Sequence, residues 1–82
     1  MKKKERAKLI DSLLVKPKSK SPAELCFALM REAESLSSKD KFRAMDCHEA
    51  IADLALESNA ASEAFYLLRE RIGANQTRLG IW

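Results

Sequence analysis

The chain has 82 residues, enough for one domain at most, and a formal net charge of +3. Only two glycines, two prolines and three phenylalanines are present, and this composition excludes a sheet-based fold and predicts an all-α one. The charge is polarised: residues 1–20 carry eight Lys/Arg and two acidic residues, whereas residues 21–82 carry seven Lys/Arg and ten acidic residues.

A chain of this length buries only about 60–65 % of its unfolded surface, so a monomer would be marginally stable. Short helical chains commonly enlarge their core by dimerising. We therefore expect a small bundle of three to four helices, completed by a homodimer.

The elements begin with a basic N-terminal helix and connector over residues 1–20. An apolar stripe predicts the helix from Lys4 to about Lys16, ending before Pro17, because proline disfavours α geometry in the residue ahead of it. The next helix, over 22–36, has the clearest start signal: Ser21 and Glu24 form the ends of a predicted capping box.

A helix over 39–58 follows, with Ser37 and Asp40 as a second candidate capping box. A last helix over 61–72 is expected to be capped by Ser62 and to end at Gly73. Residues 21–73 would thus form the helical core, and residues 74–82 an apolar C-terminal tail.

The central helix has an unusually wide apolar surface made of two adjacent stripes. The first consists of Ala44, Cys47, Ile51, Leu54 and Ala55, and the second of Phe42, Met45, Ala52 and Leu56. Such a surface is typical of a helix with neighbours on more than one side. The remaining face carries an acidic ridge of Asp46, Glu49, Asp53 and Glu57, which is either a solvated face or a docking site for the basic segment.

The basic segment is a candidate nucleic-acid-binding element, because clustered lysines neutralise phosphates without reading sequence. Its candidate contact residues are Lys2, Lys3, Lys4, Arg6, Lys8, Lys16, Lys18 and Lys20. The competing interpretation is a solvated helix. The segment has one arginine and no interleaved aromatic residues, which argues against base recognition and stacking.

Cys47 and His48 resemble a catalytic pair in composition but not in geometry. Adjacent helical residues diverge by about 100°, so the two side chains do not face each other. With Cys26, they also fall short of a zinc-ligand set. We expect buried free thiols, a histidine at the edge of the packed face, no metal and no cofactor.

The C-terminal tail is apolar and ends in tryptophan, a residue favoured in protein interfaces. It either folds back over the chain's own core or docks on a second copy or another partner. The candidate protein-binding residues are Tyr66, Leu79, Ile81 and Trp82.

Together these features predict a non-enzymatic, cytoplasmic regulatory protein that engages another protein through helical faces and its tail. The alternative is a nucleic-acid-associated protein that contacts phosphates through its basic segment. Neither hypothesis involves a membrane or a small-molecule substrate.

Overall fold

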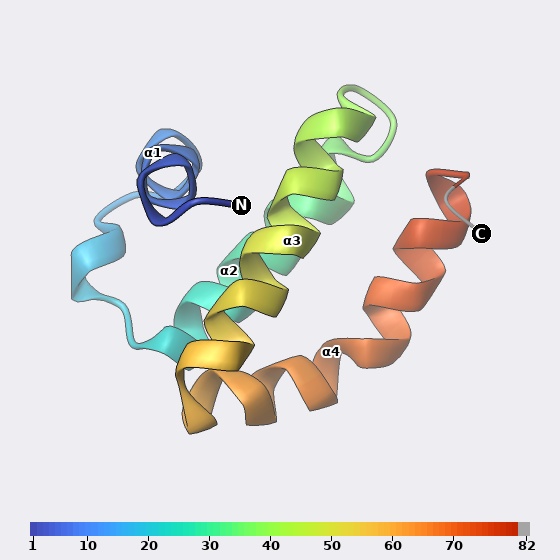
Figure 1. Cartoon of the computed structure of the whole chain (residues 1–82). Helices are drawn as coiled ribbons and strands as arrows, with labels where there is room; N and C mark the ends of the chain where they lie inside the picture. Colours follow the sequence, from blue (N-terminus) through green and yellow to red (C-terminus); the bar gives the residue numbers. More distant parts are fainter. Residues whose placement is uncertain (81–82) are drawn as a thin grey trace.

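The computed structural model describes residues 1–80 and consists there of α-helices and one short 3₁₀ turn, with no strand. The helices are α1 (Lys3–Leu13), α2 (Pro22–Leu36), α3 (Lys41–Glu57) and α4 (Asn59–Arg78), and the turn η1 is Pro17–Ser19. Figure 1 shows α1 and α4 on opposite sides of the α2–α3 pair. The predicted all-α fold is confirmed.

Short polar side chains cap the starts of α2, α3 and α4. The Ser21 hydroxyl accepts from the Glu24 N–H at 3.2 Å, and the Glu24 carboxylate accepts from the Ser21 N–H at 3.3 Å, which closes the predicted capping box. At α3 the cap is Asp40, whose carboxylate accepts from the Arg43 N–H at 3.1 Å. Ser58, rather than Ser62, caps α4.

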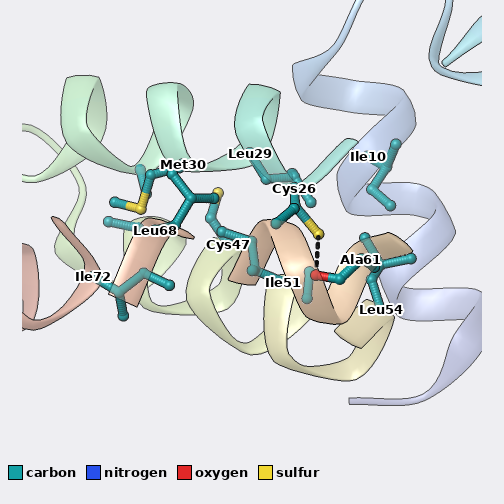
Figure 2. Close-up of a cluster of buried hydrophobic side chains, with 14 of the residues drawn as sticks. Ile10, Cys26, Leu29, Met30, Cys47, Ile51, Leu54, Ala61, Leu68 and Ile72 are labelled. Atoms are coloured by element: carbon teal, nitrogen blue, oxygen red, sulfur yellow. Dashed lines mark hydrogen bonds between the residues drawn. The ribbon is translucent and has the colours of Figure 1, made fainter. Parts of the chain in front are cut away.

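Helices α2, α3 and α4 enclose the core (Figure 2). The thiol of Cys26 donates to the Ala61 carbonyl oxygen over 3.9 Å, and Glu34 further along α2 pairs with Arg71 further along α4. From the first contact to the second, residue numbers increase along both helices, so α2 and α4 run in the same direction. The side chains of Leu29 and Met30 on α2 and of Ile51 on α3 are fully buried.

The end of α4 corrects the predicted boundary at Ile72. Gly73 does not end the helix, which continues to Arg78. The reason is packing: Leu68, Ile72, Asn75 and Leu79 are all buried and repeat at helical spacing through the glycine. Burial of this continued stripe outweighs the roughly 1 kcal/mol by which glycine disfavours a helix interior.

The residues expected to form an apolar tail are therefore mostly helical. Gly80 supplies the C-terminal stop, with a φ of +79° that suits glycine, and its N–H donates to the Thr77 carbonyl oxygen at 3.0 Å.

Helix α1 ends at Leu13, earlier than predicted, and a connector of defined shape follows it. Lys16 has a left-handed φ of 50°, and the N–H groups of Ser19 and Lys20 each donate over 3.1 Å to the carbonyl oxygens of Lys16 and Pro17. This turn brings the chain from α1 to the start of α2.

Candidate interaction surfaces

The acidic ridge of α3 receives the N-terminal helix of the same chain. Arg6 approaches Glu57 with 2.7 Å between Nη2 and Oε2, and Lys3 lies 3.6 Å from the other oxygen of Glu57. The amino group of Met1 lies 2.5 Å from Glu49. The Arg6 hydrogen bond lowers the pKa of Glu57, so the carboxylate is charged over the neutral range.

Two of the eight basic candidate residues, Lys3 and Arg6, are thus ion-paired within the chain. Four of the eight line one concavity on the α1 side, which we call the basic depression. It has a volume of about 360 Å³ and lies between α1, the connector, α2 and α3. Its basic residues are Lys3, Arg6, Lys18 and Lys20; its other lining residues are Ala7, Ile10, Asp11, Pro17, Leu25 and Leu54.

The other four basic candidates, Lys2, Lys4, Lys8 and Lys16, are exposed and do not line the depression. The structure therefore divides the basic segment into four residues that line the depression, two of them ion-paired, and four exposed residues outside it.

The two stripes of α3 have different surroundings. Ala44, Cys47 and Ile51 of the first stripe are fully buried. In the second, which we call the apolar stripe (Phe42, Met45, Ala52 and Leu56), Phe42 is 70 % exposed and Leu56 is 87 % exposed. The described chain therefore covers only one of the two apolar sides of α3.

A groove of about 490 Å³ runs between α3 and α4 beside the apolar stripe. We call it the α3–α4 groove; its lining residues are Met45, His48, Glu49, Ala52, Phe65, Arg69, Ile72, Gly73 and Gln76. Its walls are mainly apolar, with acidic and basic groups from α3 and α4 at its rim.

The candidate protein-binding residues fall in different environments. Tyr66 is 61 % exposed, and the guanidinium of Arg69 lies 4.2 Å from the centroid of its ring. Tyr66 therefore contacts Arg69, which lines the groove, through a cation–π interaction. Leu79 is buried, with only 8 % of it exposed, because it closes the end of the core stripe of α4. Ile81 and Trp82 lie outside the described residues.

His48 and Asn75 form a buried polar contact that the sequence did not predict. Nδ2 of Asn75 lies 2.8 Å from Nε2 of His48, and the two residues are 2 % and 6 % exposed, respectively. With the amide N–H as donor, Nε2 accepts and the ring proton lies on Nδ1. Among the described residues, His48 Nδ1 and Asn75 Oδ1 have no hydrogen-bond partner. Burial lowers the pKa of His48, although the charge of Glu34 opposes this shift.

Both cysteines are buried and free. Desolvation raises the pKa of Cys26 to about 11 and that of Cys47 to about 12. Each is therefore a neutral thiol near pH 7, with little of the thiolate that a nucleophile requires. Within residues 1–80, no three His, Cys, Asp or Glu side chains are grouped closely enough to hold a metal ion.

No helix in the described part of the chain combines the length and apolar character needed to cross a membrane. No family model, curated protein or solved structure matches this chain.

Proposed function

We propose that this protein is a non-enzymatic binding module that engages another protein through the apolar stripe and the α3–α4 groove. The observation that carries the proposal is the exposure of Phe42 and Leu56 on a helix whose other apolar stripe is mostly buried. Burying large side chains of this kind contributes about 25 cal/mol per Å² of apolar surface removed from water.

The groove has the features expected of a site for a helix of a partner. An amphipathic helix binds such grooves through apolar side chains that repeat every three or four residues. Met45 and Phe65 provide apolar contacts on the two walls, and Arg69 and Glu49 offer opposite charges for orientation. A second copy of the chain is the first occupant to test, since dimerisation would enlarge a small core.

Light scattering of the purified protein over a range of concentrations tests this occupant. We expect a dimer, and we expect Phe42→Glu/Leu56→Glu to be monomeric with unchanged helicity. Leu67→Glu is the matched control: Leu67 is 70 % exposed on α4 but belongs neither to the apolar stripe of α3 nor to the lining of the groove, so this variant should still dimerise. Equal disruption by Leu67→Glu would contradict the assigned surface.

A monomeric wild type would exclude the second copy and direct the search to a different protein. A photo-crosslinking residue at position 56 should then give one discrete adduct in an extract of the native host. The same residue at position 67 should give none. Absence of a discrete adduct at position 56 would refute the proposed function.

A further inference from the structure

We propose that the basic depression is a second binding site, which accepts an acidic segment of a partner protein with one apolar side chain inserted between the lysines. The site lies on the α1 side of the molecule and shares no lining residue with the α3–α4 groove. The two proposals can therefore fail independently.

The first argument is charge. Asp11 is the single acidic residue among the ten that line the depression, against four basic ones. Glu57 pairs with Lys3 and Arg6, whereas Lys18 and Lys20 have no ion pair in the described part of the chain. Those two ammonium groups are available to carboxylates of a ligand. Lys3 is also available for exchange, since its side chain is 83 % exposed and its contact with Glu57 spans 3.6 Å.

The second argument is the apolar lining between the charges. Ile10 and Leu54 are each 8 % exposed and belong to the edge of the core, and Leu25 beside them is half-buried. The volume, about 360 Å³, lies toward the lower end of the roughly 300–1,000 Å³ typical of ligand pockets. A single large apolar side chain, leucine or phenylalanine, matches this lining and size.

The third argument is preorganisation. The connector that carries Lys18 and Lys20 is not an open coil: η1 is closed by two backbone hydrogen bonds, and the Ser19 hydroxyl donates to the Lys16 carbonyl oxygen at 2.8 Å. Lys16 holds a left-handed conformation that a residue with a side chain adopts only at an energetic cost. A connector fixed in this way loses less backbone entropy when a ligand binds.

These observations favour a peptide over a nucleic acid. A phosphate backbone would gain from the lysines but nothing from Ile10 and Leu54. Aromatic stacking is the usual additional contribution to single-strand binding, and within residues 1–80 no aromatic ring lines the depression. The one arginine, Arg6, is already paired with Glu57.

Fluorescence anisotropy tests the proposal with a labelled peptide of glutamates that flank one central leucine. A second peptide has serine in place of the leucine, and a labelled DNA duplex serves as the third ligand. We expect the leucine peptide to bind saturably and at least tenfold more tightly than the serine peptide. Lys18→Glu/Lys20→Glu should weaken its binding at least tenfold without changing the circular dichroism spectrum.

The matched control is Lys39→Glu/Lys41→Glu, which makes the same charge change at exposed positions near the start of α3. It should retain affinity within twofold, as should Phe42→Glu/Leu56→Glu, whose positions do not line the depression. Equal binding of the two peptides together with strong duplex binding would overturn the proposal in favour of a general phosphate-binding surface. Equal loss in the control, or no saturable binding of the leucine peptide, would also overturn it.

Discussion

Helices α1 and α2 both pack against α3, but they do so by different means. Four residues of α2 (Cys26, Leu29, Met30 and Ala33) are fully buried, and a capping box closes its start. One residue of α1, Ile10, is buried, and its cap position has no side-chain hydrogen bond. Other contacts of α1 are partly buried Leu9 and Leu13 against the core and ion pairs of Lys3 and Arg6 with Glu57.

This difference indicates two levels of stability within one small chain. Segments with few buried apolar contacts open at a lower free energy than the core that they cover. Helices α2, α3 and α4 should therefore unfold together, whereas α1 should detach before them. Detachment would also dismantle the basic depression, since Ile10, Lys3 and Arg6 all come from α1.

The largest effect is expected from a cavity in the three-helix core. Leu68 is 1 % exposed, and Leu68→Ala should lower the free energy of unfolding by about 2–5 kcal/mol. Leu67→Ala, one residue away on the exposed side, should change it by about 0.5 kcal/mol or less. Urea denaturation followed by circular dichroism measures both. Similar losses would mean that α4 does not pack as described.

An equivalent truncation in α1 sharpens the comparison. Ile10→Ala should lower the stability of α1 docking on the core. Because α1 can detach on its own, this loss cannot exceed the free energy with which α1 is docked. Hydrogen exchange should accelerate across Lys3–Leu13 in this variant and remain unchanged in the buried part of α3. Uniform acceleration through all four helices would show that α1 belongs to the same cooperative unit.

The polar contact between α3 and α4 should give the next largest effect. Asn75→Ala removes the partner of buried His48 and should cost about 1–3 kcal/mol of unfolding free energy. Replacing both residues, His48→Leu/Asn75→Leu, removes the unpaired polar atoms as well and should restore stability close to that of the wild type. A double variant as unstable as Asn75→Ala would contradict this account.

The pH dependence of stability provides a milder perturbation of the same contact. Burial lowers the pKa of His48 below its usual 6.5, so the unfolded chain binds a proton more readily than the folded one. Stability from this source is complete above about pH 6.5 and declines as the pH falls below it. The urea midpoint should therefore be lower at pH 5.5 than at pH 7, and the difference should disappear in His48→Leu/Asn75→Leu.

Much of the core was predictable from local signals. The start of α2 follows from Ser21, Pro22 and Glu24, and the buried stripe of α3 follows from helical periodicity. The end of α4 was not predicted, because a glycine after an apolar residue normally marks a helix terminus. The stripe of residues at helical spacing from Ile72 through Asn75 to Leu79 indicated that the helix continues past the glycine. Because Asn75 is polar, the apolar periodicity was not recognisable there.

The surfaces were harder to predict than the core, because each depends on contacts between distant segments. Opposite charges on residues 1–20 and on α3 suggested docking, and Arg6 does meet Glu57. The pattern did not reveal that Lys18 and Lys20 would join Lys3 around an apolar lining. That grouping depends on the left-handed turn at Lys16. A lysine in the sequence does not predict such a backbone conformation.

The smallest expected effect concerns the ion pair that anchors α1. Arg6→Ala removes the principal hydrogen bond to Glu57 and should accelerate hydrogen exchange in α1 roughly two- to fivefold, with no change in the core.

Added salt should reproduce the acceleration in the wild type, because it screens charges this near the surface, and should have little further effect on Arg6→Ala. Acid should also weaken the docking of α1, seen as a lower protection factor once the slower intrinsic exchange at low pH is allowed for. The pKa of Glu57 is lowered in the folded chain, so its contribution is complete above about pH 4.5 and is lost as the pH falls. An α1 that resisted salt, acid and Arg6→Ala alike would be held by Ile10 and its apolar neighbours, and the contrast with α2 would then be one of buried area alone.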